Sequence, residues 1–552
     1  MSITINHQTN DISATSGSLT IDGAAAGGAS SNTGTGNFLG GTGAGAALES
    51  GGQYNTLLGQ QAGNDITTGD NNVALGYDAL SRLTTTSLNT AIGYQAGQLI
   101  AGGSGAVAVG FQALQNSTNA DGVTAVGVYA ASHAVGSTNS VYLGKQAGRF
   151  TSGTQNVVIG YEAGDASGSS YEYSTLVGTG TGSAAMTGDY NTAIGYQAGN
   201  KIIGGQRNTM LGWWAGYNLT EGDYNTLLGG QTGQAITTGT YNVAVGQSAL
   251  DAATTGSNNV GVGQNAAGAI TTGSQNVAIG QDALATNTTG QMNTAVGYYA
   301  LNKATQDNNV GLGRSAGQQI TTGERNIAIG YNPMGTSAGV TGSDNIGIGY
   351  DALEDLTSGN YNIGFGRNAG ANLTTGSSNI GIGRDSLGSG SVALTGSYNH
   401  GFGYLALNKL TTGTHNVIFG AYAGKNITTG ADNVAIGRNA LDTATTGSNH
   451  IAIGKDAMSN GAVTSLDQNI GIGTQALHDT TSGYYNIAVG MSAAANITTG
   501  FSNIAIGIGA LQYLTTSNTN VAIGQNSGYN TTNGENTFVG AYSGRYNTTA
   551  GY

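Results

Sequence analysis

The sequence contains no cysteine and only one proline in 552 residues. The lack of cysteine excludes a disulfide-stabilised scaffold and a thiolate metal site. A collagen-like triple helix would need abundant proline and glycine at every third position. Charged residues make up only 8% of the chain while 38% of residues are hydrophobic, which argues against a charged disordered polymer.

Positive charge is scarce, with 15 Lys and Arg against 28 Asp and Glu, so the formal net charge is −13. Such a chain has no basic face for nucleic-acid phosphates or an anionic membrane surface. Nothing approaches the ~20 consecutive apolar residues of a membrane span. We therefore expect no nucleic-acid partner and no membrane insertion. The opening MSITINHQTNDISATSGSLTIDG also lacks the basic and apolar regions of a secretion signal.

The chain contains a short repeated phrase, seen as NVAIG at 276–280, 433–437 and 520–524. Aligned on its last glycine, the phrase occurs 29 times between Gly59 and Gly540, and 21 of the 28 intervals are 17 residues long. A degenerate copy, 36–40, precedes the first. The phrase has β-branched or other aliphatic residues on either side of a small residue, which is the alternation of a β-strand. Glycine, threonine and asparagine are too frequent for a helix.

A second run, typically ITTG or LTTG, follows each phrase, so each repeat predicts strand, glycine turn, strand and glycine turn. The repeat is too short for a crossover helix. We therefore predict an all-β protein, a parallel β-solenoid of about 29 coils with a 17-residue repeat. We expect the glycines to adopt positive φ at corners or to allow close backbone approach. At ~4.8 Å per coil, 28 steps would give a rod of about 135 Å.

Asparagine opens the phrase in 24 of the 29 copies, with Ala106, Val123, Ser140, Ser174 and His450 as the substitutes. An active site would require one copy to differ from the rest, whereas a structural ladder requires the same residue in each coil. We therefore predict that the amides bond from coil to coil. The predicted ladder includes Asn191, Asn208, Asn225, Asn242, Asn259, Asn276 and Asn293.

Each coil buries only a few side chains, and the free energy gained by burying them has to offset the backbone entropy lost by ordering 17 residues. Because the core is so thin, we expect a partner chain to contribute to it. We expect the β-branched residues to face the core and the small Ala or Gly between them to lie on the back of the strand. There, another backbone could approach closely, as in a symmetric homotrimer.

The phrase N-[VT]-A-[IV]-G followed by x-x-A-x resembles the head repeats of trimeric autotransporter adhesins over residues 55–552. That resemblance implies a left-handed parallel β-roll in which three chains pack around an axis. The family's head repeat is nearer 14 residues than 17, and this sequence shows neither the secretion signal nor the membrane anchor of the adhesins. The opening segment resembles the N-termini of bacteriophage tail-fibre proteins, which need no export signal.

The first fifty residues do not follow the repeat and suggest short strands at Ser2–Ile5 and Ser18–Ile21. We interpret residues 1–50 as an attachment or capping segment and residues 51–552 as the solenoid domain, because the ends of a solenoid need caps. The chain stops just before the next expected asparagine. This suggests either a portion of a longer protein or a head-to-tail filament.

No catalytic, cofactor or metal site is predicted. The six histidines are scattered, and the Asp residues at Asp78, Asp282, Asp351, Asp385 and Asp456 are too sporadic for calcium sites, so we read them as turn carboxylates. Tyrosines are frequent in turns, and amphipathic rings there could stack on sugars. The adjacent Trp213 and Trp214 are the best candidates for a glycan contact.

These observations favour a structural, non-enzymatic fibre protein: a phage tail fibre on the virion tail that contacts a host cell-surface glycan or protein. The alternative is a bacterial cell-surface filament or adhesin that assembles head to tail. An ice-binding solenoid is a third reading, suggested by the threonines. Because adjacent threonines of a strand point to opposite faces, each coil would offer a single outward threonine, which weakens that reading.

Overall fold

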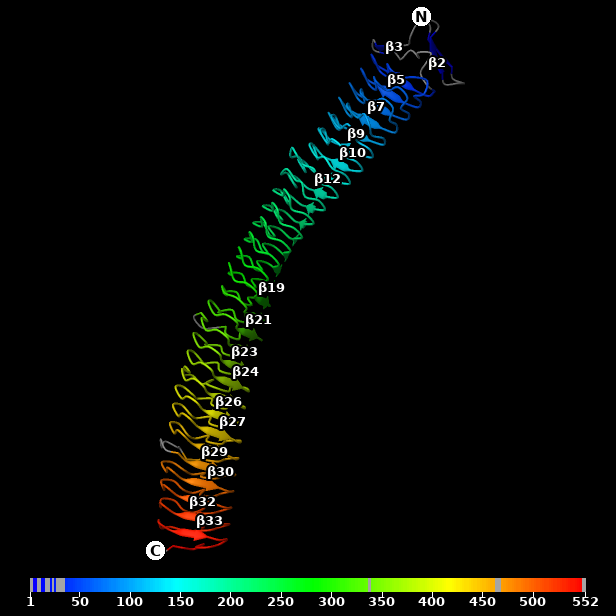
Figure 1. Ribbon diagram of the computed structural model, residues 1–552. Coiled ribbons are helices and arrows are strands. Elements are labelled where there is room, and N and C mark those ends of the chain that lie inside the picture. Colours follow the sequence, from blue (N-terminus) through cyan, green and yellow to red (C-terminus); the bar gives the residue numbers. More distant parts are fainter. Residues whose placement is uncertain are drawn as a thin grey trace. The chain divides into compact units, whose positions relative to one another are not determined.

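A computed structural model of the chain describes residues 35–335, 339–461 and 468–548, and the backbone of four short strands before them. The chain divides into two compact units, Met1–Ser274 and Gln275–Tyr552. In each unit, short parallel strands lie side by side in chain order, and the described residues contain no helix (Figure 1). The predicted all-β parallel solenoid with a 17-residue repeat is confirmed.

In the first unit, β1 (Ile3–Asn6) pairs antiparallel with β2 (Asp11–Ala14), and β3 (Thr20–Ile21) pairs antiparallel with β4 (Ala24–Ala25). These strands match the two predicted near the N-terminus, although Ser2, Ser18 and Leu19 lie outside the described residues. The solenoid strands of this unit are β5 (Phe38–Gly40), β6 (Thr56–Leu58), β7 (Val73–Leu75), β8 (Thr90–Ile92), β9 (Val107–Val109), β10 (Thr124–Val126), β11 (Val141–Leu143), β12 (Val157–Ile159), β13 (Thr175–Val177), β14 (Thr192–Ile194), β15 (Thr209–Leu211), β16 (Thr226–Leu228), β17 (Val243–Val245) and β18 (Val260–Val262).

The second unit is built in the same way. Its strands are β19 (Val277–Ile279), β20 (Thr294–Val296), β21 (Val310–Leu312), β22 (Ile327–Ile329), β23 (Ile346–Ile348), β24 (Ile363–Phe365), β25 (Ile380–Ile382), β26 (His400–Phe402), β27 (Val417–Phe419), β28 (Val434–Ile436), β29 (Ile451–Ile453), β30 (Ile470–Ile472), β31 (Ile487–Val489), β32 (Ile504–Ile506), β33 (Val521–Ile523) and β34 (Thr537–Val539).

Equivalent residues of neighbouring coils lie directly beside one another, as in the pairs Thr192↔Thr209, Ala193↔Met210 and Ile194↔Leu211. We number each coil from the glycine that follows its strand, which is position 0. The strand then occupies positions −3 to −1 and the asparagine position −4. Every position of the repeat therefore forms a column of equivalent residues along the stack. Any surface of the solenoid is made of such columns.

The direction of the strand side chains corrects one prediction. The residue at position −2, usually Ala or Gly, is buried in every strand from β6 to β33, and the side chains at −3 and −1 are half-buried or exposed. Ala193 is 0% exposed, whereas Leu211 at position −1 of β15 is 48% exposed. The coil is narrow, and its interior is already filled from the turn by residues such as Ala62, Leu80 and Ile66, so only small side chains usually fit inward from the strand.

Volumes inside the coil are matched between neighbours. Gly311 lies at the centre of β21, and a Cβ there would be 2.7 Å from Cγ of Leu301 in the preceding turn. Conversely, Leu57 at the centre of β6 lies against Gly63, where a Cβ would be 2.8 Å from the Leu57 Cδ1 atom. A glycine in one element thus leaves room for a leucine from another. The interior is closely packed because the volumes of neighbouring side chains are complementary.

The second run of each repeat does not form a regular strand. Thr237 N donates to Thr254 O at 2.9 Å and Thr254 N donates to Thr271 O at 2.9 Å, so the run is still bonded from coil to coil. Among the described residues, only the bridges Ile320↔Val340 and Leu373↔Leu394 have strand geometry there. Each coil therefore contains one three-residue strand instead of the two that we predicted.

The repeat begins before residue 51. The degenerate copy contributes β5, which pairs in parallel with β6, and Ala47 N donates to Asn64 O of the next coil at 3.0 Å. Residues 35–50 thus belong to the stack, and the attachment or capping role of the segment before them stays a prediction. Most of that segment lies outside the described residues.

Candidate functional site

The asparagines at position −4 form a buried column of amide hydrogen bonds. Asn225 Oδ1 accepts from the backbone N of Asn242 at 3.0 Å and from its Nδ2 at 3.1 Å. Asn225 Nδ2 donates to Asn208 Oδ1 at 3.0 Å and to Gly239 O at 2.9 Å. Each amide thus joins its own coil to both neighbours, and the glycine that ends the ITTG run supplies one of the acceptors.

The other predicted members make the same kinds of contact. Asn208 donates to Asn191 Oδ1, Asn259 to Asn242 Oδ1, Asn276 to Gly290 O and Asn293 to Asn276 Oδ1. Where serine replaces asparagine, its hydroxyl takes over part of the role, since Asn191 N donates to Ser174 Oγ at 3.1 Å. At His450, the Nδ1 atom accepts from Asn469 N at 3.3 Å. All of these side chains are buried, so the column supports the fold and offers nothing to a ligand.

Replacement of Asn225 by alanine is expected to lower the free energy of unfolding by about 2–4 kcal/mol, because several buried donors and acceptors lose their partner. Thermal unfolding followed by circular dichroism measures the loss. Asn225→Ser should recover part of it, since serine serves at position 174, and Asn119→Ala at an exposed site should have little effect. If Asn225→Ala and Asn119→Ala lowered the free energy of unfolding equally, the asparagine ladder would not contribute to stability.

Trp213 and Trp214 meet at one corner of the solenoid, at positions +1 and +2. Their ring centroids are 5.3 Å apart with the planes inclined by 58°, so the two indoles do not form a flat platform. Trp214 is half-buried and its Nε1 donates to Gln197 Oε1 at 2.9 Å. Trp213 is 44% exposed and one edge of its indole covers Gly230 of the next coil. Glycan contact at this corner stays a prediction, with Trp213 as the accessible ring.

Several surface aromatic rings stack on the equivalent ring of the next coil. Tyr173 and Tyr190 have centroids 4.9 Å apart and planes 4° apart, and Tyr224 and Tyr241 repeat this arrangement at 4.9 Å and 5°. Between the two pairs, the Arg207 guanidinium lies 5.3 Å from the rings of both Tyr190 and Tyr224. Their faces are therefore used within the protein, and mainly their edges and hydroxyls remain for a sugar.

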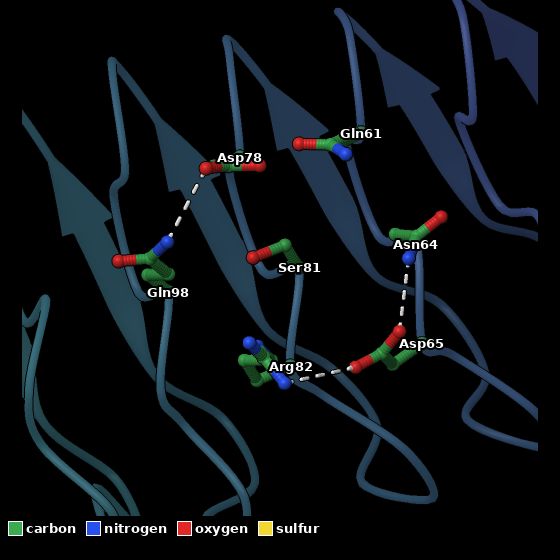
Figure 2. A pocket seen from close by; sticks show the side chains of 7 residues that line it. All are labelled: Gln61, Asn64, Asp65, Asp78, Ser81, Arg82 and Gln98. Atoms are coloured by element: carbon green, nitrogen blue, oxygen red, sulfur yellow. Dashed lines mark hydrogen bonds and ion pairs between the residues drawn. The ribbon is translucent and has the colours of Figure 1, made fainter.

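A polar groove of about 240 Å³ crosses three coils of the first unit. It is lined by Gln61, Asn64, Asp65, Asp78, Ser81, Arg82 and Gln98 (Figure 2). Asp65 accepts from Asn64 Nδ2 at 2.9 Å and lies 4.0 Å from Arg82 Nη1, while Gln98 Nε2 donates to Asp78 Oδ2 at 3.3 Å. Amides and a guanidinium thus engage both carboxylates. Among the lining residues no histidine, cysteine or lysine could act as a nucleophile or a neutral base beside them.

The turn carboxylates considered as calcium ligands accept hydrogen bonds from side-chain amides, four of them from an amide of a neighbouring coil. Asp351 accepts from Asn332, Asp385 from Asn368 and Asp456 from Asn439, at 2.8–2.9 Å. Asp78 accepts from Gln98 and Asp282 from the adjacent Gln281. Among the described residues, no three His, Cys, Asp or Glu side chains lie together in a group that could hold a metal ion.

Asp165 is the carboxylate with the largest change in acidity. Burial raises its pKa to about 6, and the neighbouring Arg149 guanidinium only partly opposes the effect. Because this pKa exceeds that of the unfolded chain, about 3.9, the folded protein binds the proton more tightly. Stability is therefore lost as the pH rises from about 4 to about 6, and the loss is complete above that range.

We expect Asp165→Asn to raise the free energy of unfolding at neutral pH by about 1 kcal/mol, a value reduced for the partial exposure of the side chain. Below pH 4 the variant and the parent should unfold alike. Asp344→Asn provides a control of opposite sign, because hydrogen bonds from Arg325 lower the pKa of Asp344 and their loss should destabilise the protein at neutral pH. Melting temperatures measured across this pH range test both variants, and a pH-independent effect of Asp165→Asn would contradict the assignment.

The feature that sequence reasoning missed is the outward face of the sheet. The side chains at positions −3 and −1 form two columns on that face, which are Ile, Val, Leu or Phe at position −1 and Val, Ile or Thr at position −3 apart from His400. At position −1, ten of them are 36–51% exposed: Ile92, Val126, Leu211, Ile279, Phe365, Phe419, Ile436, Ile472, Ile506 and Ile523. The described part of the chain has no helix that is long and apolar enough to cross a membrane, so these columns are not part of a helical span.

No protein-family model matches the chain, and no curated protein is significantly similar to it. The repeats, their columns and the outward sheet face are therefore the basis for assigning a function.

Proposed function

We propose that the chain is a structural and adhesive fibre protein, a phage tail fibre, in which three parallel copies pack through the outward faces of their sheets. The observation that carries this proposal is the apolar face itself. Position −1 is Ile, Val, Leu or Phe in every coil from β6 to β34. In the second unit, position −3 is Val or Ile except at Thr294, His400 and Thr537.

The occupant that best fits this face is another copy of the chain. Columns of aliphatic side chains at a constant coil spacing match columns with the same spacing, so two copies can be in register along many coils. The second unit alone presents on the order of 1,000 Å² of apolar surface in this way, which exceeds the largest patch on a typical monomer and reaches the ~800 Å² per partner of a stable interface. A closed ring of three covers the face of every copy, since each face points toward the shared axis.

Adhesion is proposed because a repetitive stack suits the role of holding a contact surface away from its anchor. The described residues contain no metal cluster that would favour an enzyme, and in the polar groove of the first unit an amide contacts Asp78 and a guanidinium lies near Asp65. The partner is a host cell-surface glycan or protein. The virion tail is the proposed location, and a bacterial surface filament is the alternative.

Native mass spectrometry or sedimentation tests the assembly. The proposal expects a species of three times 54.8 kDa, and a single-chain mass at micromolar concentration would overturn it. Immunoelectron microscopy tests the location, because antibodies against the chain should label tails of virions. Labelling of bacterial filaments instead would favour the alternative.

A further inference from the structure

Position +1, directly after the strand-ending glycine, carries no Asp or Glu in any of the 29 coils from Gly59 onward, although the chain is acidic overall. The same column holds six of the 15 Lys and Arg residues: Lys145, Arg314, Arg367, Arg384, Arg438 and Lys455. Five of these six lie in the second unit. This unit therefore has a strip of positive charge beside its apolar face.

Six consecutive coils of this column, β21 to β26, carry only arginine or tyrosine, three of each, and we call them the arginine–tyrosine strip. Its members are Arg314, Tyr331, Tyr350, Arg367, Arg384 and Tyr404. Tyr331 and Tyr350 are stacked with centroids 5.1 Å apart, and Tyr331 and Tyr350 are 43% and 48% exposed. The strip is thus continuous along the coils and accessible to solvent.

The cations of the strip lie over the tyrosine rings. Arg314 is 5.4 Å from the Tyr331 centroid, Arg367 is 5.5 Å from that of Tyr350, and Arg384 is 4.4 Å from that of Tyr404. Ring faces are consequently occupied by guanidinium groups or by other rings. What the strip presents outward is a row of guanidinium N–H and phenol O–H groups, which are hydrogen-bond donors.

The contacts with tyrosine rings stabilise each arginine singly, but they do not explain why two arginines occupy adjacent coils. Arg367 and Arg384 occupy neighbouring coils ~4.8 Å apart along the stack, and like charges side by side across a sheet are unfavourable. Arg384 is relieved by Asp385, whose carboxylate is 3.2 Å away. Among the described residues, Arg367 has no carboxylate in an ion pair with it, and Arg314 and Arg438 have none either. Arg438 and Lys455 repeat the pair of cations four coils further on, so that three coil steps separate Arg384 from Arg438.

We propose that the arginine–tyrosine strip binds an extended carboxylated polysaccharide that runs along the coil stack. This assignment rests on the proposed adhesive function and specifies the ligand class. Guanidinium groups bind carboxylates through paired, charge-assisted hydrogen bonds. The groups of cations lie about 14 Å apart, three coil steps, so one extended chain that carries carboxylates along its length can contact several groups at once.

Two other polymers fit the strip less well. A neutral glycan would need free ring faces to stack on, and these faces are occupied. The bases of a single-stranded nucleic acid would also need free ring faces, and the charge of a duplex, one per ~1.7 Å, is much denser than the cation groups of the strip.

The test measures binding of the full-length protein to immobilised polygalacturonate, with dextran and single-stranded DNA as comparison polymers. Binding should be strongest to polygalacturonate and weaken with added salt. Arg367→Gln with Arg384→Gln should weaken it about tenfold or more, and Arg367→Lys with Arg384→Lys should weaken it less, because the charge is kept while the paired hydrogen bonds are lost. The matched control, Lys409→Gln with Lys425→Gln, removes two charges from neighbouring coils outside the strip and should leave binding unchanged.

Four results would overturn the inference: no binding to polygalacturonate, equal loss in the control, equal or tighter binding of DNA, or a change of assembly mass in the Arg→Gln variant. The last result would make the strip a contact between copies. Melting temperatures of all variants show whether the fold is intact. If the parent protein is a trimer but does not bind the polysaccharide, the fibre proposal still stands. A single-chain mass of the parent protein would contradict the fibre proposal whatever the binding result.

Discussion

Lysine in place of both Phe365 and Ile436 is expected to break the proposed trimer into single chains of 54.8 kDa. These side chains are 51% and 41% exposed at position −1 of β24 and β28, so in one chain they point away from the core. In a trimer the two substitutions place six ammonium groups in an apolar contact. Each costs several kcal/mol unless its flexible stem reaches water, so the dissociation constant should rise at least about a hundredfold. Sedimentation over a concentration series measures the change.

The single chains should remain folded, because an outward lysine costs a strand less than about 1 kcal/mol in propensity. The control is Val392→Lys with Ile203→Lys, which adds the same charge at side chains that are 60% and 42% exposed but lie off the sheet. This control should keep the parent's mass. If both double variants assemble as the parent does, copies do not meet through the outward face.

The ladder and the coil were predictable because both depend on identical residues at a fixed period. Asn225 must have Asn208 and Asn242 one coil away on either side once the repeats stack in register, and an amide that both donates and accepts can then bond along the whole column. Periodicity alone therefore indicated parallel stacking. It also placed the glycine ends of the strands at corners.

Which face of the strand is buried could not be read from the alternation. A period of two separates Thr192 and Ile194 from Ala193 but does not say which set points inward. The answer depends on how much space the turn leaves, and that space is filled by side chains such as Ala62 and Leu80. The sequence did contain an indication of the buried face, because the side-chain volumes at the strand centre and in the turn are complementary. Glycine, for example, stands at the centre of β21, where Leu301 fills the space.

The backbone conformation of the turns also could not be predicted from the sequence. Many corners use residues other than glycine at positive φ, including Tyr190 at +60° and Leu250 at +52°. Such residues rarely adopt this conformation on their own, so the coil-to-coil hydrogen bonds hold them there. For example, Tyr190 N donates to Glu172 O at 3.0 Å and Leu250 N donates to Ala266 O at 3.0 Å.

Alanine in place of Gly195, which follows β14, is expected to destabilise the protein by about 3–5 kcal/mol, the range for a substitution that combines backbone strain with overpacking. Gly195 has φ +138°, which side chains disfavour, and a Cβ there would collide with the carbonyl group of Gly212, lying 2.6 Å from its carbon. That carbonyl belongs to the backbone of the next coil, so it cannot move aside as a flexible side chain could. The neighbouring bond from Gly212 N to Ile194 O, 2.8 Å long, would be strained as well.

Because each coil is stabilised mainly by its neighbours, the damage should be local. Hydrogen exchange is expected to accelerate most in the coils of β14 and β15, and thermal unfolding should split into two transitions if the stack separates at this step. Gly105→Ala separates the two causes, since Gly105 also has positive φ, +70°, but nothing lies within 4 Å of its added Cβ. That variant should lose about 1–2 kcal/mol. Equal losses at the two sites would mean that backbone strain alone, and not the approach of adjacent coils, requires glycine at the end of the strand.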